Sequence, residues 1–194
     1  MAYPLKKQEK KFTYNDYLTW PDEERWELIE GVAYDMSPAP SRQHQAILRE
    51  LLLEFASFLR GKNCRVYVAP FDVRLPERGE KDEDITNVVQ PDLVVVCDRQ
   101  KLDNRGCKGA PTIVIEIVSP YTVSKDIQKK FFLYERFGVK EYWIVHPIDK
   151  TVMVFKLEEN GEYGRPKMYT ENDKVEVDIL GALVIDLDIV FREE

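Results

Sequence analysis

The feature that most constrains this chain is a pair of apolar segments that each contain one acidic residue. The segments are VVQPDLVVVCD (residues 88–98) and TIVIEIVSP (residues 112–120), and the acids are Asp92 and Glu116. Near-continuous apolar runs of this length are typical of strands that are buried on both faces. A carboxylate in such a strand is costly unless it is paired, hydrogen-bonded or bound to a metal ion. We therefore expect two central strands whose acidic side chains have specific partners.

The segment that follows, SKDIQKKFFLYERFG (residues 124–138), predicts a helix with a lysine on its apolar face. At about 100° per residue, Lys130 falls within the apolar arc beside Tyr134, whereas Lys129 falls outside that arc. A lysine on an apolar face should have a fixed partner. One alternative is a pair with Asp126, one turn earlier on the same helix. Because a surface pair does not need a buried position, we interpret Lys130 as directed at the two strand acids.

Length and composition indicate a soluble globular protein with one domain over residues 1–194. Hydrophobic residues make up 44% and charged residues 32% of the chain, and no apolar run is long enough to span a bilayer. We expect no membrane partner, a flexible lysine-rich leader at residues 1–11 and a β-rich extension at residues 151–194. The three cysteines form no C-x-x-C pair, which favours reduced thiols in the cytoplasm over a disulfide framework or a zinc site.

The remaining patterns predict a mixed α/β fold, of the α+β kind, with helices flanking a central sheet. We expect helices at 13–20 and 42–60, a hairpin at 25–38 that turns at Glu30-Gly31, one strand at 64–75 interrupted at Pro70, and strands at 141–147 and 151–157. Three other polar residues could act near the acids. His44 begins the apolar face of the second helix, where packing or capping is the alternative; Gln90 could orient a ligand or simply end a strand; and Asp72 could join the acids.

The net charge of −7 argues against promiscuous binding of nucleic acid. Basic residues are dispersed, with modest clusters at 6–11 and 125–130. A nuclease remains compatible with this balance, because bound metal ions and local lysines can attract phosphate.

Taken together, these motifs resemble the PD-(D/E)XK nuclease superfamily and, within it, the Uma family of restriction-endonuclease-like proteins. The matching stretches span about residues 25–157 and are ELIEG, MSPAPS with His44 beyond it, VVQPDLVVVCD, GAPTIVIEIVSP, the Asp126…Lys130…Tyr134 spacing and GVKEYWIVHP. The resemblance implies a restriction-endonuclease-like fold, with Asp92 and Glu116 as metal ligands and Lys130 as the catalytic lysine. It also implies Glu27 as a further catalytic acid, and His44 as a site neighbour. Asp126 and Tyr134 are further candidate neighbours of the site, although we expect Tyr134 mainly to pack in the core next to Lys130.

The sequence departs from the family pattern at three positions. Val118 stands where the superfamily motif has its lysine, which in this branch has moved to the following helix. His146 replaces an expected aspartate, and Thr112 stands where the family often has aspartate. None of these changes affects the expected metal ligands.

The first functional expectation is a Mg²⁺- or Mn²⁺-dependent endonuclease that hydrolyses DNA phosphodiester bonds with an activated water. Cutting both strands of a duplex needs two active sites, so we expect a homodimer. The alternative is a catalytically inactive binding protein of the same fold, in which the acids and lysine form a structural ion network. Metal binding at Asp92 and Glu116 would separate the two hypotheses.

Overall fold

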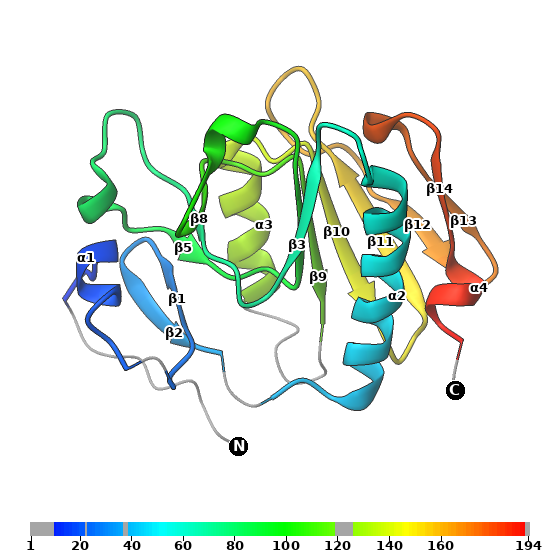
Figure 1. Cartoon of the computed structure of the whole chain (residues 1–194), viewed down its shortest axis with the longest axis horizontal. Helices are drawn as coiled ribbons and strands as arrows, with labels where there is room; N and C mark the ends of the chain where they lie inside the picture. The colour runs from blue at the N-terminus through cyan, green and yellow to red at the C-terminus, as the bar shows by residue number, and fades with distance from the viewer. Residues whose placement is uncertain (1–9, 22, 37–38, 119–125, 193–194) are drawn as a thin grey trace.

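The centre of the molecule is a six-stranded mixed sheet (Figure 1). The computed structural model describes residues 10–21, 23–36, 39–118 and 126–192, with the backbone alone at 126 and 127. In order across the sheet, the strands are β12 (Lys167–Thr170), β11 (Thr151–Lys156), β10 (Glu141–His146), β9 (Ile113–Ile117), β6 (Leu93–Val96) and β3 (Arg65–Val68). Strands β9 and β10 are parallel, and the other neighbouring pairs are antiparallel. The expected mixed central sheet is confirmed.

Side chains alternate along the central strands and so divide between two cores. On β6, Leu93 and Val95 pack in the core that contains helix α2 (Arg42–Leu59). Val94 packs in the other core, with helix α3 (Asp126–Phe137). The two helices therefore cover opposite faces of the sheet. No helix within the described residues is both long and apolar enough to cross a membrane.

Both long helices begin at the edge of the sheet where β9 ends (Figure 1). Ser41 caps α2, and its Oγ accepts a hydrogen bond of 3.2 Å from the backbone N–H of His44. Helix α3 is the crossover between the parallel strands β9 and β10, so it must start at the carboxyl end of β9. This topology brings the starts of α2 and α3 to the same edge as the acidic residues.

A second six-stranded sheet packs beside α3 and supplies further residues to that edge. In order, its strands are β2 (Val32–Asp35), β1 (Trp26–Ile29), β5 (Val88–Val89), β4 (Val73–Arg74), β8 (Gly106–Lys108) and β7 (Leu102–Asp103). Helix α1 (Tyr14–Tyr17) precedes β1 in the chain. The 3-10 turns η1 (Asp82–Asp84) and η2 (Arg99–Lys101) precede β5 and β7. The predicted β1–β2 hairpin is confirmed: Glu30 and Gly31 both have positive φ, 53° and 77°, as its tight turn requires.

Two sequence segments that were predicted as single strands each contribute to both sheets. Residues 64–75 form β3 in the central sheet and β4 in the second sheet, and residues 88–98 form β5 and β6 in the same way. The breaks fall at Pro70 and Pro91, which have no N–H to donate to a strand ladder. Asp92 consequently lies in the connection just before β6 and not within the strand.

The C-terminal part adds strands and packs against the α2 side of the central sheet. Strands β13 (Lys174–Val177) and β14 (Leu183–Asp186) form a separate antiparallel pair, joined by the 3-10 turn η3 (Asp178–Leu180), and α4 (Leu187–Val190) follows. Apolar residues of these elements join the α2 core. The β-rich extension is thus confirmed as part of the fold class. The expected limits of the domain stay a prediction, and residues 1–9 of the expected leader lie outside the described residues.

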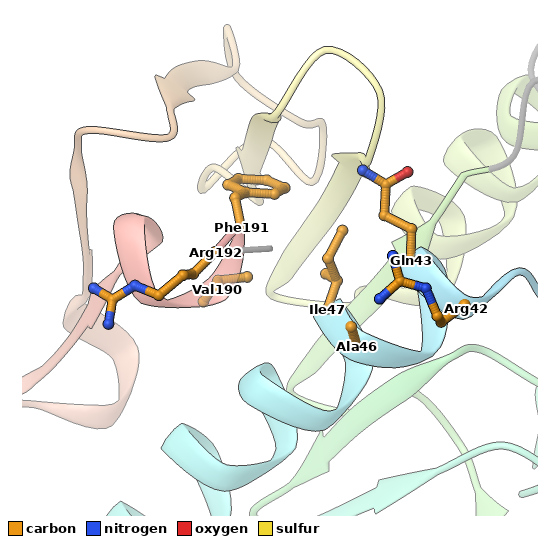
Figure 2. A pocket seen from close by; sticks show the side chains of 7 residues that line it. All are labelled: Arg42, Gln43, Ala46, Ile47, Val190, Phe191 and Arg192. Carbon is orange, nitrogen blue, oxygen red and sulfur yellow. The ribbon is translucent and has the colours of Figure 1, made fainter. Parts of the chain in front are cut away.

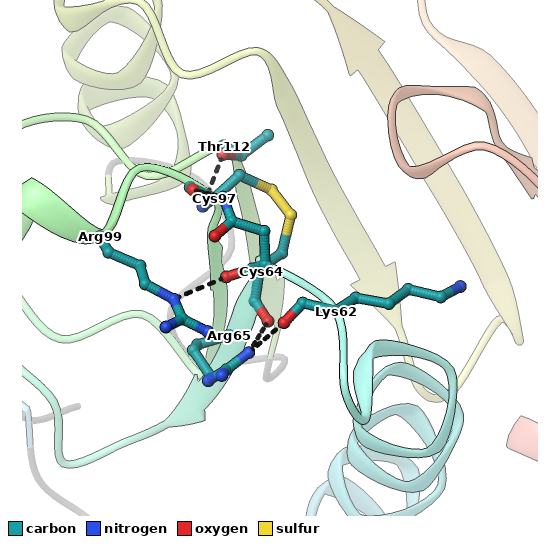
Figure 3. Close-up of a disulfide and its surroundings, with 7 residues drawn as sticks. Lys62, Cys64, Arg65, Cys97, Arg99 and Thr112 are labelled. Carbon is teal, nitrogen blue, oxygen red and sulfur yellow. Dashed lines mark hydrogen bonds between the residues drawn. A yellow bond between two sulfur atoms is a disulfide. The ribbon is translucent and has the colours of Figure 1, made fainter.

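Cys64 and Cys97 form a disulfide, so the expectation of reduced thiols is wrong (Figure 3). The antiparallel register of β3 and β6 pairs Arg65 with Val96, and its next pair places the two cysteines opposite each other. They are 33 residues apart in sequence, which is why no short motif indicated the bond. Cys107 is a buried free thiol. The cysteines therefore no longer support a reducing compartment.

Candidate active site

Asp92, just before β6, and Glu116 of β9 lie opposite each other in the pairing of the two strands. The antiparallel register joins Leu93 to Ile115 and Val94 to Val114, and its next pair places Asp92 opposite Glu116. Glu116 is 9% exposed, on the face of β9 that packs toward α3. The backbone N–H of Ile117 donates a hydrogen bond of 2.8 Å to Asp92 Oδ2. Pairing of the two strands thus fixes both carboxylates at one edge of the sheet.

Lys130 connects Glu116 to an acid from the other sheet. Its ammonium lies 3.0 Å from Glu116 Oε1 and 2.8 Å from Oε1 of Glu27, which belongs to strand β1. All three side chains are at least 88% buried. The structure therefore brings together three of the four residues that the resemblance implied as catalytic, and the fourth, Asp92, faces Glu116. The side chain of Asp126, the alternative partner of Lys130, lies outside the described residues.

Tyr134 completes this cluster from the next turn of α3. Its hydroxyl donates a hydrogen bond of 2.7 Å to the same Glu116 oxygen that Lys130 contacts. Tyr134 is fully buried and packs edge-on against Tyr142 of β10. The predicted packing role of Tyr134 is therefore accompanied by a direct hydrogen bond to a proposed metal ligand.

The electrostatic environment keeps these groups in distinct protonation states. Burial raises the pKa of Glu116 to about 7 against the opposing charge of Lys130, and the charges of Asp92 and Glu27 add to the rise. Burial would lower the pKa of Lys130, but attraction to Glu116 and Glu27 outweighs it, and the pKa is raised. Burial and the Glu116 charge hold the pKa of Tyr134 well above its ordinary value. Lys130 thus stays charged and Tyr134 protonated near neutral pH, where Glu116 titrates.

His44 reaches the site from the first turn of α2. Its Nε2 lies 3.2 Å from Asp92 Oδ1, and the residue is 7% exposed. Its other ring nitrogen, Nδ1, is buried and has no hydrogen-bond partner among the residues that the structure describes. Both oxygens of Asp92 therefore have protein contacts, one from β9 and one from α2. The packing interpretation of His44 and its interpretation as a site neighbour are both compatible with this geometry.

Gln90 and Asp72 lie on the β1 side of the cluster. The backbone N–H of Gln90 donates a hydrogen bond of 2.8 Å to Glu27 Oε1, so Gln90 contacts the site directly. Asp72 instead accepts hydrogen bonds of 3.0 Å from Tyr17 and from the Gln90 side chain. Asp72 therefore belongs to a neighbouring network, and no contact between Asp72 and the three acids is observed among the described residues.

Sequence reasoning missed Arg25, which adjoins this network. Both Nε and Nη2 of Arg25 donate to Gln90 Oε1, at 3.3 and 3.1 Å. One signal could have identified it: Arg25 lies two residues before Glu27 in an extended segment, and such residues point to the same side of a strand.

The donor set of the cluster suits a hard divalent cation. Asp92 and Glu116 offer carboxylate oxygens, the ligand type that Mg²⁺ and Mn²⁺ prefer. Lys130 contacts two of the three carboxylates, Glu27 and Glu116. Burial raises the pKa of Glu116, and the charges of Asp92 and Glu27 add to the rise. Within the described residues no three His, Cys, Asp or Glu side chains already form a metal-binding group. Mg²⁺ commonly uses one or two carboxylates together with water and substrate phosphate, so the two acids fit such an ion.

A hollow lies between the start of α2 and α4, and it shares no residue with the carboxylate cluster (Figure 2). Its lining residues are Arg42, Gln43, Ala46, Ile47, Val190, Phe191 and Arg192. None of them is a member of the carboxylate cluster. The candidate site is thus defined by its buried charged residues and not by this hollow.

Three comparisons relate the chain to known proteins. A family model named Uma2, with the description "Putative restriction endonuclease", matches residues 14–188. The uncharacterized protein slr1290 of Synechocystis sp. is 24% identical over 185 residues, which cover 94% of this chain and 92% of that protein. A crystal structure from Anabaena variabilis, titled as a putative nuclease belonging to DUF820, superposes with a TM-score of 0.73 at 21% identity, covering 93% of this chain and 97% of that one. This similarity confirms the predicted fold.

Proposed function

The chain belongs to the Uma2 family, and we propose that it is a divalent-metal-dependent nuclease that hydrolyses phosphodiester bonds of DNA. The observation that carries the proposal is the buried contact of Lys130 with Glu27 and Glu116, beside Asp92. Perturbed pKa values and buried charges concentrate at catalytic sites, because catalytic groups need pKa values matched to their task and burial and neighbouring charges shift those values. Two acids and a lysine at one sheet edge also suit hydrolysis of a phosphate ester.

Each residue then has a chemical role. Asp92 and Glu116 would hold Mg²⁺ or Mn²⁺, and Glu27 would be a further acidic member that orients Lys130. A bound divalent ion supplies a lowered pKa for the attacking water and neutralises charge on the phosphate. Lys130, whose raised pKa keeps it charged, would stabilise the negative charge that develops on the phosphoryl group. His44 and Ile117 would keep Asp92 oriented through their contacts with its two oxygens.

The direction of the two long helices supports an anionic substrate. Helix α2 and helix α3 both start at the sheet edge that holds the carboxylates (Figure 1). The N-terminus of a helix carries a partial positive charge and attracts phosphate groups. This local field acts against the overall charge of −7 and favours binding at this edge over binding elsewhere on the surface. We propose DNA as the substrate, bound by a homodimer so that two sites can cut the two strands.

Calorimetric titration with Mg²⁺ or Mn²⁺, with plasmid nicking assayed alongside, tests the proposal. Wild type should bind the ion and nick the plasmid, and Glu116→Ala should lose both activities. The matched control is Glu176→Ala, which removes an exposed carboxylate from β13 and should change neither. Absence of metal binding by wild type, even with DNA present, would refute the metal-dependent nuclease.

A binding protein without catalytic activity is the second candidate, and one observation favours it. The groups of the cluster contact one another directly, because Lys130 and Tyr134 both donate to Glu116 Oε1. Such an arrangement could serve as a structural ion network. Absence of metal binding by wild type would favour this function, as would a Glu116→Ala variant that changes stability alone. Metal binding without nicking would instead keep the metal site and point to a different substrate.

A further inference from the structure

Arg25 was not anticipated from the sequence and has no role in the chemistry described so far. Arg25 is half-buried and lies two residues before Glu27. The backbone N–H of Met36 donates to the Arg25 carbonyl, which extends the β1–β2 pairing by one position and fixes the backbone there. The Arg25 side chain is thus placed on the same side of the strand as the Glu27 carboxylate.

The partner of Arg25 is a neutral amide and not a carboxylate. Two of its nitrogens share the single oxygen Oε1 of Gln90, and among the described residues no acidic group lies within ion-pair distance of its guanidinium. The chain has 35 acidic residues against 28 basic ones, so carboxylates are abundant. A neutral acceptor orients a guanidinium but leaves its charge uncompensated. Arg25 therefore keeps its positive charge for another partner.

The orientation of the Gln90 amide is determined from both of its ends. Its Nε2 donates hydrogen bonds of 3.0 Å to the Tyr17 hydroxyl and to Asp72 Oδ1. A carboxylate can only accept a hydrogen bond and a guanidinium can only donate one, so the amide nitrogen must face Asp72 and its oxygen must face Arg25. Tyr17 also donates to Asp72, at 3.0 Å. The Gln90 amide is thus hydrogen-bonded at both ends, and the network ends on the Arg25 guanidinium.

Arg74 of β4 shows what a structural arginine looks like in the same molecule. Its side chain is 1% exposed, and two of its nitrogens bind the carboxylates of Asp82 and Asp103 at 2.6 to 2.9 Å. A buried guanidinium needs this compensation because desolvation of a charge is costly. Arg25 differs in both respects: it is partly accessible to solvent, and its charge is not paired. These differences fit a residue that binds an anion from solution.

We propose that Arg25 is a phosphate-binding residue of the candidate site, held in position by Gln90, and that it binds a backbone phosphate of the nucleic acid beside Glu27. The inference rests on the proposed nuclease function. A guanidinium suits this role because its forked donors match two phosphate oxygens. Gln90 also contacts Glu27, since the Gln90 N–H donates to Glu27 Oε1. Gln90 thus positions the anion-binding group through its side chain and a residue of the carboxylate cluster through its backbone.

The test measures the salt dependence of binding, which counts phosphate contacts and does not depend on catalysis. A labelled DNA duplex with hydrolysis-resistant phosphorothioate linkages is titrated in Mg²⁺ at several salt concentrations, with fluorescence anisotropy as the readout. Loss of one phosphate contact should reduce the slope of log K against log salt by about 0.9. For Arg25→Gln we expect that reduction together with a loss of affinity on the order of tenfold.

Two further variants make the test specific. Gln90→Glu keeps Arg25 but gives it a carboxylate partner, so it should lower the affinity and the slope in the same direction. Its fold is checked by circular dichroism and thermal melting, because the new carboxylate adjoins Asp72. Arg105→Gln is the control, because Arg105 is an exposed arginine that lies 3.8 Å from Asp82. It should leave the affinity and the slope unchanged.

Three results would count against the inference, and they differ in what they leave standing. If Arg25→Gln binds the duplex with the affinity and slope of wild type, the inference is overturned, while the nuclease function stands as long as wild type nicks plasmid. An equal change in Arg105→Gln would indicate a general charge effect and would also overturn it. If wild type neither binds nor cleaves nucleic acid, the proposed function fails, and the role of Arg25 fails with it.

Discussion

Lys129 and Lys130 are neighbours in sequence, and the structure places them in opposite environments. Lys130 is buried between Glu27 and Glu116, whereas Lys129 is exposed and donates to the Tyr34 hydroxyl. Removing one partner of a buried ion pair leaves an uncompensated charge, which typically costs about 3–5 kcal/mol. Removing an exposed charge usually changes stability by less than about 0.5 kcal/mol. The two lysines therefore form a matched pair for mutation.

We predict that Lys130→Met lowers the free energy of unfolding by about 3–5 kcal/mol, because Glu27 and Glu116 lose their shared cation. Lys129→Met should change it by less than about 1 kcal/mol. Urea denaturation at pH 7 measures both values. Adding Glu116→Gln to Lys130→Met should recover part of the loss, since one buried charge is then removed. Equal effects for the two lysine variants would contradict the buried network.

The raised pKa of Glu116 predicts a pH-dependent stability. The carboxyl has an ordinary pKa of 4.5 and a folded-state pKa of about 7, so its contribution to stability is fully present below pH 4.5 and is lost as pH rises toward and through 7. The shift corresponds to a loss of about 3 kcal/mol over that range. Chemical denaturation of wild type and Glu116→Gln between pH 4 and 8 isolates this contribution as the difference between the two curves. Parallel curves would show that Glu116 does not titrate in this range.

At the residue scale, the sequence indicated polar residues that lie among apolar ones more clearly than it indicated which residues they contact. The helical pattern placed Lys130 on the buried face of α3, and Asp92 and Glu116 were recognisable because they interrupt apolar runs. Arg25 and its partner Gln90 are 65 residues apart. Their contact depends on how β1 pairs with β5, and no local pattern carries that information.

At the scale of elements, one arginine, Arg74, holds two surface segments to a strand of the second sheet. Arg74 of β4 bridges Asp82, in the loop before β5, and Asp103, at the end of β7. Burial opposes a charged Arg74, but hydrogen bonds and charge from Asp103 and Asp82 outweigh burial and raise its pKa. The arginine thus fixes two surface segments to one strand.

We predict that Arg74→Met destabilises the protein by about 1–3 kcal/mol, because two partly exposed acids lose their charged hydrogen-bond donor. Proteolysis should then cut first in the loop at residues 76–87. Arg105→Gln, which removes only a weak exposed contact to Asp82, should stay within about 0.5 kcal/mol of wild type. Limited proteolysis with mass spectrometry and urea denaturation test both statements. An unchanged cleavage pattern in Arg74→Met would refute the role assigned to this arginine.

Which sheet each strand joins could not be predicted from the sequence. Alternation and apolar runs identify strands, and they correctly marked residues 64–75 and 88–98 as extended. Pairing partners, however, are set by contacts between distant segments: Val88 of β5 pairs with Leu28 of β1 and with Arg74 of β4. Pro70 was recognised as an interruption, and only the tertiary structure shows that the chain changes sheets there and at Pro91.

At the scale of the whole molecule, the disulfide ties two strands of the central sheet together. Cys64 precedes β3 and Cys97 follows β6, so the bond closes a loop that contains β4, β5 and their connections. Those elements belong to the second sheet. The bond therefore cross-links β3 and β6 of the central sheet, and the loop that it closes supplies two strands of the other sheet.

A cross-link of this kind stabilises mainly by restricting the unfolded chain, and the effect grows with loop length. For a separation of 33 residues the chain-entropy relation gives about 3–4 kcal/mol. Reduction with dithiothreitol should therefore lower the urea midpoint of wild type. The double variant Cys64→Ser/Cys97→Ser should match reduced wild type and should not respond to the reductant. Three titratable thiols in unfolded wild type without reductant, together with an unchanged midpoint, would mean that the bond does not form and would restore the expectation of a reduced chain.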